Sequence, residues 1–201
     1  FDSESRAAAA GGVTTVLDMP NTIPATVTAE ALQEKIERAQ NLCHVNFGFF
    51  VGATADNAHR LRQINPSIVA GVKLFMGSST GSLQVEDPDA LLTVFEESRL
   101  PIMVHCEDTP MITAAMKEHQ ALYGADPHVR YHATIRSAEA CFKSTQQAIA
   151  LAKATQARLH VAHISTACEL DLFSPNDPLI TAEACLPHLL FTDADYERLG
   201  T

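Results

Sequence analysis

Three residues at the ends of apolar segments carry side chains that could do chemistry together. Lys73 lies in GVKLFM, near the C-terminal end of an apolar run over 68–76. His105 ends the segment PIMVH, and His163 stands late in LHVAHIS. Neutral imidazole is a common zinc ligand. One lysine and two histidines at three such segment ends therefore indicate a metal site, although each histidine taken alone is as well explained by a structural role.

The sequence around Lys73 leaves four roles open. A buried ammonium is costly, so a lysine in an apolar strand is expected to be neutral or paired. It could act as a Schiff-base nucleophile or as a general base. It could also react with CO2 to form an anionic carbamate whose two oxygens bridge two cations. In the fourth role, Lys73 only extends its ammonium from a strand end into solvent.

Other polar residues are weaker candidates. His160 and His163 share a predicted strand, and residues three apart on a strand point to opposite faces, so only His163 is retained. Asn21, in DMPNT, offers a ligand both a donor and an acceptor, or it is an ordinary turn residue. His188 is ambiguous. The remaining histidines are interpreted as solvated or structural: His44, His59, His119, His128 and His132.

The elements that would position these residues alternate between strand and helix. We predict strands over 13–19, 45–51, 68–76, 101–105, 159–165 and 179–185, with helices over 4–10, 29–40, 111–123 and 137–155 and another starting at Asp87-Pro88. Nearly continuous apolar strands are typical of a parallel sheet that is covered on both faces. The irregular stretch 124–136 reads as an insertion between the fourth and fifth strands.

Two folds fit this alternation, an open doubly wound sheet and a TIM-type (β/α)8 barrel. The nucleotide-binding motifs G-x-G-x-x-G and G-x-x-x-x-G-K-[ST] are absent, which disfavours the first. A barrel needs eight strands, and six are predicted. With no linker rich in Gly, Ser or Pro, we expect residues 1–201 to be a single but incomplete barrel domain.

Composition excludes several classes of protein. The formal net charge of -10 argues against a nucleic-acid-binding surface. The five cysteines form no C-x-x-C pair, which favours a reducing, cytoplasmic setting. No apolar run is long enough to span a membrane, and the N-terminus does not resemble a secretory signal.

Five motifs occur in the order found in one enzyme family: AGGVTTVLDMPNT, GVKLF, VHCE, HVAHIST and TAEACLPHLLF. The sequence resembles dihydroorotases of the amidohydrolase superfamily, and the MPN triplet favours them over hydantoinases and allantoinases. The resemblance implies strands two to seven of the barrel. It implies that Lys73 is a carboxylated lysine bridging two zinc ions and that His105 and His163 bind the second zinc. Asn21 would contact the substrate carboxylate, and Glu183 and His188 are candidates for lining the site.

The implied reaction is the reversible cyclisation of N-carbamoyl-L-aspartate to L-dihydroorotate in de novo pyrimidine biosynthesis. In the hydrolytic direction, a hydroxide between the zinc ions attacks the cyclic amide. The family's H-x-H pair with its nearby arginine, an asparagine after strand seven and an aspartate after strand eight are not found. We therefore expect the general-base aspartate beyond Thr201, no catalytic acid–base residue within 1–201, and an inactive 201-residue segment.

Three rival functions remain open. A hydantoinase or allantoinase would use the same metals on another cyclic ureide. A Schiff-base aldolase would use Lys73 as its nucleophile. A non-catalytic dihydroorotase homologue would serve as a structural protein. For the enzymatic functions the partner is a small-molecule substrate, and a homodimer is possible.

Overall fold

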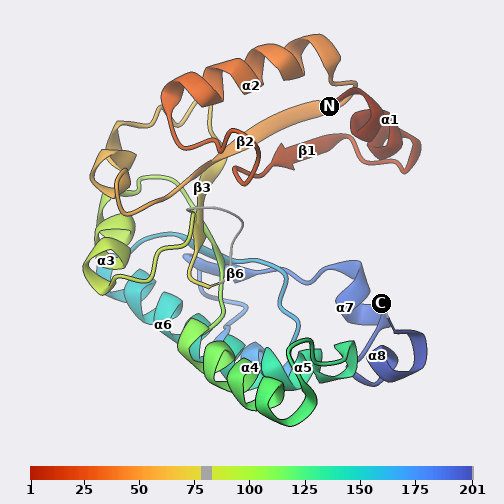
Figure 1. Ribbon diagram of the computed structural model, residues 1–201. Helices are drawn as coiled ribbons and strands as arrows, with labels where there is room; N and C mark the ends of the chain where they lie inside the picture. Colours follow the sequence, from red (N-terminus) through yellow and green to blue (C-terminus); the bar gives the residue numbers. More distant parts are fainter. Residues whose placement is uncertain (78–82, 201) are drawn as a thin grey trace. The chain divides into compact units, whose positions relative to one another are not determined.

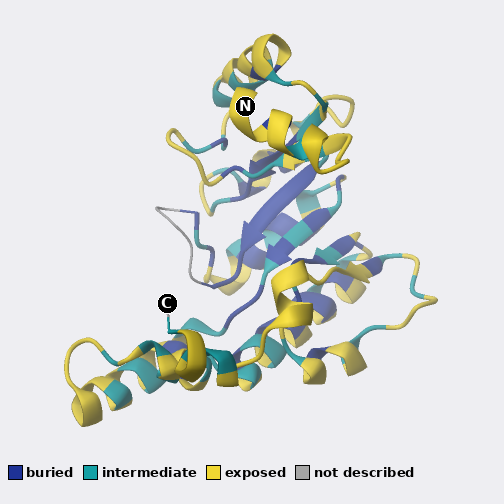
Figure 2. Cartoon of the chain, turned by 90° about the vertical axis from the view of Figure 1, so that its right-hand side faces the viewer, coloured by how far each residue is buried: buried dark blue, intermediate teal, exposed yellow. Residues whose placement is uncertain are grey.

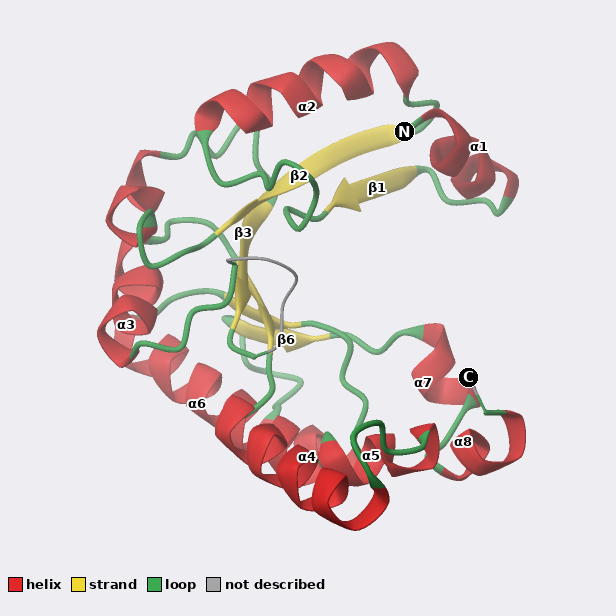
Figure 3. Cartoon of the chain, viewed as in Figure 1, coloured by secondary structure: helices red, strands yellow, loops and turns green. Residues whose placement is uncertain are grey.

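The computed structural model describes residues 1–77 and 83–200 and divides them into two compact units. The first unit contains residues 1–74 and 83–103, and the second contains residues 75–77 and 104–200. Strands and helices alternate along the chain (Figures 1 and 3). The strands are β1 (Thr15–Asp18), β2 (Asn46–Gly52), β3 (Gly71–Phe75), β4 (Ile102–His105), β5 (Leu159–Val161) and β6 (Ile180–Ala182).

The six strands follow chain order in the sheet, β1-β2-β3-β4-β5-β6. The pairs β1–β2, β2–β3 and β5–β6 are parallel. Parallel neighbours in strict chain order, each followed by a helical connection, are the arrangement of a (β/α)8 barrel. The predicted fold class, part of a TIM-type barrel, is confirmed. The alternative of an open doubly wound sheet does not describe this strand order.

The longer helices are α1 (Asp2–Ala10), α2 (Ala29–Leu42), α3 (Pro88–Glu97), α4 (Thr109–Tyr123) and α6 (Ala138–Thr155). Four of them begin at a side chain whose oxygen accepts a hydrogen bond from a backbone N–H of the first turn. These caps are Thr28, Asp87, Asp108 and Ser137. The predicted start of a helix at Asp87-Pro88 is confirmed, because the proline occupies the first turn, where its missing N–H costs nothing.

Shorter helical elements fill the connections. They are the 3-10 turns η1 (Ala58–Gln63), η2 (Val129–Tyr131) and η3 (Ala167–Leu172), and the short helices α5 (His132–Ile135), α7 (Leu186–Leu190) and α8 (Ala194–Leu199). The sequence did not predict α5, α7 or α8. None of the helices in the described part of the chain has both the length and the apolar character that crossing a membrane requires.

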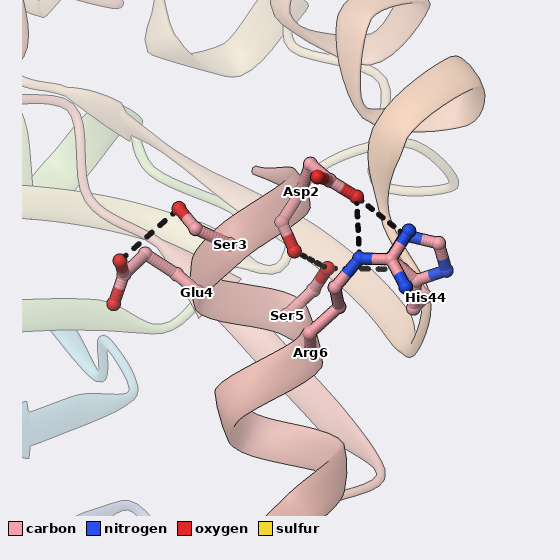
Figure 4. A network of polar contacts seen from close by, with 6 residues as sticks. All are labelled: Asp2, Ser3, Glu4, Ser5, Arg6 and His44. Atoms are coloured by element: carbon pink, nitrogen blue, oxygen red, sulfur yellow. Dashed lines mark hydrogen bonds and ion pairs between the residues drawn. The ribbon is translucent and has the colours of Figure 1, made fainter.

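The first unit is built around β1, β2 and β3. All five residues of β3 are buried, and α2 runs beside β2 (Figure 1). A polar network anchors α1 to the residues that precede β2 (Figure 4). In it, Ser5 Oγ accepts a hydrogen bond from the backbone N–H of His44 at 3.1 Å, and Asp2 Oδ1 lies 2.7 Å from His44 Nε2 and 2.9 Å from Arg6 Nε.

The second unit packs α6 against β5, η3 and α4. Burial follows the strands and the inward faces of the helices, whereas the outward faces are exposed (Figure 2). Ile112, Ile135 and Ala140 form a small core that joins α4, α5 and α6. These apolar residues therefore hold α4 and α5 against the start of α6.

Candidate metal centre

His105 is the last residue of β4 and belongs to the second unit. Ile102 and Val104 are fully buried, whereas Met103 and His105 on the opposite face are partly exposed. This alternation is the period of two expected of a strand. It directs the His105 imidazole away from the core, at the strand end where barrel enzymes carry their active-site residues.

His163 lies two residues beyond the end of β5. The predicted strand over 159–165 is therefore wrong after Val161, and the argument from alternating faces does not apply to His163. Its neighbours are held on both sides: Ala162 N–H donates to Val104 O at 3.1 Å, and Ile164 N–H donates to Glu183 O at 2.7 Å.

His163 itself has a backbone φ of 44°, in the left-handed region that favours glycine. Such a conformation costs an L-residue on the order of 1–3 kcal/mol, and it persists where the surrounding structure enforces it. The backbone bonds on either side of His163 supply that restraint.

The two imidazoles face each other through one nitrogen each. His105 Nδ1 lies 3.2 Å from His163 Nε2. Two metal–nitrogen bonds of about 2.0–2.1 Å, separated by a tetrahedral angle, hold their nitrogens roughly 3.3 Å apart. The observed distance thus fits two ligands of one tetrahedral cation. A cation can bind both nitrogens only when neither of them carries a proton.

Glu107 fixes the other side of the His105 ring. Its Oε2 lies 3.0 Å from His105 Nε2, and because a carboxylate only accepts, Nε2 carries the proton and Nδ1 is the atom available to a cation. Metal-binding histidines commonly donate their second N–H to a carboxylate in this way. Burial raises the pKa of Glu107, but hydrogen bonds from His105 and Arg136 outweigh burial and lower its pKa to about 2.

Sequence reasoning missed Glu107 and Arg136 as members of this site. A signal for Glu107 was present, because in VHCE a glutamate follows the candidate histidine by two residues. No such signal exists for Arg136, which lies 29 residues further along the chain. Its guanidinium binds both carboxylate oxygens of Glu107, with a distance of 2.8 Å from Nε to Oε1.

The other sequence candidates lie as follows. Lys73 occupies the middle of β3 in the first unit, with 4% of its surface exposed, and its carbonyl accepts a hydrogen bond from Ala53 N–H. Asn21 is exposed in the loop after β1. In the second unit, Glu183 Oε2 lies 3.3 Å from His160 Nε2, and His188 is exposed on α7.

Within residues 1–77 and 83–200, no three His, Cys, Asp or Glu side chains cluster as a metal site would require. The described residues do bring together a pair of histidines, His105 and His163. Glu107 contacts His105, and Arg136 contacts Glu107. Two imidazoles and an orienting carboxylate form a suitable partial ligand set for a divalent cation, which would complete its coordination with other groups.

Comparison with known proteins gives a consistent set of relatives. No protein-family model matches the chain. A dihydroorotase of Methanosarcina mazei is 31% identical over 208 residues, which cover 98% of this chain and 44% of that protein. An allantoinase of Rubrobacter xylanophilus is 32% identical over 210 residues, which cover 100% of this chain and 45% of that protein.

Among solved structures, an L-hydantoinase (dihydropyrimidinase) from Arthrobacter aurescens matches with a TM-score of 0.91 at 28% identity. The match covers 100% of this chain and 46% of that one. The chain thus spans a little under half the length of the relatives that it matches. Over almost all of its own length, it is similar to the cyclic amidohydrolases of the amidohydrolase superfamily, among them dihydroorotases, allantoinases and hydantoinases.

Proposed function

We propose that the full-length protein is a dihydroorotase, which reversibly cyclises N-carbamoyl-L-aspartate to L-dihydroorotate with release of water, a step of de novo pyrimidine biosynthesis. The observation that carries this proposal is the His105–His163 nitrogen pair at 3.2 Å, in a chain that is 31% identical to a dihydroorotase. The substrate is a small molecule. We further propose that all the described residues belong to one barrel domain of a cytoplasmic enzyme, which could act as a homodimer.

The proposed centre would hold two zinc ions. His105 and His163 would bind one of them through Nδ1 and Nε2, and Lys73, as a carbamate, would bridge the pair. Burial of Lys73 in an apolar strand supports this role, because a carbamate formed with CO2 is an anion that a bound cation would neutralise. When bound, such ions lower the pKa of water and polarise a carbonyl oxygen.

The chain's own residues would orient the reaction. Glu107 holds His105 in the tautomer that exposes Nδ1, and Asn21 would offer its amide to the substrate carboxylate. Glu183 and His188 are proposed to line the site. In the hydrolytic direction, water adds across the ring amide, whose C–N bond breaks while the leaving nitrogen gains a proton.

A hydantoinase or allantoinase activity is the second candidate. It is favoured by the TM-score of 0.91 with an L-hydantoinase and by 32% identity to an allantoinase. Assays of the full-length protein on dihydroorotate, hydantoins and allantoin separate the two. Turnover of dihydroorotate with little activity on the others supports the proposal, and the reverse order of rates overturns it.

The metal site is tested separately, by measuring zinc content in the wild type and in Lys73→Ala. We expect about two zinc ions per wild-type chain and a marked loss in the variant. Unchanged zinc content in the variant would refute the carbamate role. A wild-type protein that binds no zinc and turns over none of these substrates would instead favour a non-catalytic homologue, and trapping of substrate on Lys73 by borohydride would favour an aldolase.

A further inference from the structure

Four side chains of the second unit form a continuous chain of polar contacts, His163–His105–Glu107–Arg136. We propose that Arg136 is a positioning residue of the metal centre. Through Glu107, it holds the His105 ring in the orientation and tautomer that present Nδ1 to a cation. This inference rests on the proposed function, since it assumes that His105 is a metal ligand.

The contacts leave Glu107 little freedom to turn. Arg136 binds both of its carboxylate oxygens, and Oε2 also accepts the proton of His105 Nε2 at 3.0 Å. The glutamate side chain is 9% exposed, whereas that of Arg136 is 31% exposed. A rotation of the carboxylate that breaks the bond to His105 would also break the fork from Arg136.

The backbone of Glu107 is restrained from a second direction. Gly77 packs so closely that a Cβ at this position would lie 2.7 Å from Glu107 O and 2.8 Å from Glu107 Cβ. Real Cβ atoms do not approach other atoms so closely, so only glycine fits without displacing Glu107. The side chain therefore projects from a fixed backbone position, and the remaining freedom is the rotation that Arg136 limits.

Arg136 is equally well anchored. It ends α5, where its N–H donates to His132 O at 2.8 Å, and it precedes Ser137, the cap of α6. The first turn of α6 is also linked to the segment that follows β4, since Asp108 N–H donates to Ala140 O at 3.1 Å. The irregular stretch 124–136 thus has a function: it delivers a guanidinium to the carboxylate behind His105.

An arginine suits this role better than a lysine would. The planar guanidinium presents parallel N–H groups that match both oxygens of a carboxylate. This pairing fixes the orientation of the carboxylate in addition to balancing its charge. A lysine ammonium would supply the charge but would leave the carboxylate free to rotate about a single contact.

The experiment measures Co2+ affinity and the visible absorption spectrum of the full-length protein after its metal has been removed. Loss of an orienting partner of a metal ligand typically weakens metal binding about 10- to 100-fold. We expect a loss of that size for Arg136→Ala and a smaller loss for Arg136→Lys. Added guanidinium chloride, at concentrations too low to unfold the protein, should recover part of the affinity of Arg136→Ala.

Two control variants remove a cation nearby without touching Glu107. Arg130→Ala lies in the same stretch, where Arg130 contacts Tyr131 and Glu197. Lys143→Ala removes the partner of Asp108, 2.7 Å away. Both controls should bind Co2+ as the wild type does. If they weaken binding as much as Arg136→Ala does, then general charge or packing is responsible, and the proposal is overturned.

A readout without metal separates this inference from the proposed function. In the metal-free protein with 15N-labelled histidine, the His105 signal (identified by its loss in His105→Asn) should report a proton on Nε2. In Arg136→Ala it should shift toward a mixture of tautomers. An unchanged tautomer together with unchanged Co2+ affinity overturns the proposal. If Arg136→Ala does not fold, Arg136→Lys carries the same two measurements.

Failure of the wild type to bind Co2+ at all would instead refute the metal site of the proposed function. The tautomer measurement would then still decide whether Arg136 orients His105.

Discussion

Glu107 should make the metal-free protein sensitive to acid in a measurable way. Its pKa is lowered from 4.5 to about 2, because hydrogen bonds from His105 and Arg136 outweigh the effect of burial. A carboxyl group whose pKa is lowered on folding stabilises the protein above its unfolded pKa, and this stabilisation is lost as the pH falls toward the folded pKa. The sensitive window is therefore between about pH 5 and pH 2.

The size of the effect follows from the same two pKa values. They correspond to roughly 3 kcal/mol of stability at neutral pH, of which about 2 kcal/mol is lost by pH 3. Glu107→Gln removes the titrating group. The free energy of unfolding should thus fall between pH 7 and pH 3 by about 2 kcal/mol more in the wild type than in Glu107→Gln.

Urea unfolding of the chelator-treated protein at pH 7, 5 and 3 measures this difference. Glu118→Gln is the matched control, because Glu118 is exposed on α4 and lies outside the contact chain His105–Glu107–Arg136. Its pH dependence should follow that of the wild type. Equal losses of stability in the wild type and Glu107→Gln would refute the reasoning, because they would show that Glu107 is not held ionised by its two partners.

Two further predictions concern the surroundings of the site. Glu169 is buried and accepts hydrogen bonds of 2.6 Å from the hydroxyls of Thr145 and Thr166. Because Thr145→Val removes one of these donors, it should lower the free energy of unfolding, measured with urea, by about 1–3 kcal/mol. An unchanged free energy of unfolding would contradict this. Burial, with smaller effects of nearby carboxylates, raises the pKa of Cys141 to about 12. At pH 8, a maleimide should therefore label the exposed Cys168 far faster than Cys141. Mass spectrometry of the labelled peptides measures the two rates. Comparable rates would contradict that expectation.

Strand and helix types were well predicted from local pattern. Each of β1 to β6 lies within a predicted strand or overlaps it closely, and α3 begins at Asp87-Pro88, as the sequence predicted. These features depend on residues within a few positions of each other, so the sequence contains the information directly. The short helices α5, α7 and α8 were missed because a helix of one or two turns has too few residues to show a periodic pattern.

The site was predicted only in part. His105 was correctly placed at the end of its strand, whereas His163 was assigned to a strand that ends two residues before it. The left-handed backbone of His163 is enforced by hydrogen bonds from its neighbours to Val104 and Glu183, which are distant in sequence. The metal-ligand role of Lys73 stays a prediction.

The sequence by itself determined the alternation of strands and helices, the family resemblance and the candidate histidines, because these depend on residue types and on short spacings. Only the tertiary structure decided that His105 and His163 meet at 3.2 Å and that Arg136 binds Glu107 behind them. Those pairs are 58 and 29 residues apart, and the path of the chain between them sets their distance. The physical reason is that local preference fixes each element, whereas packing of the elements on one another fixes which side chains come together.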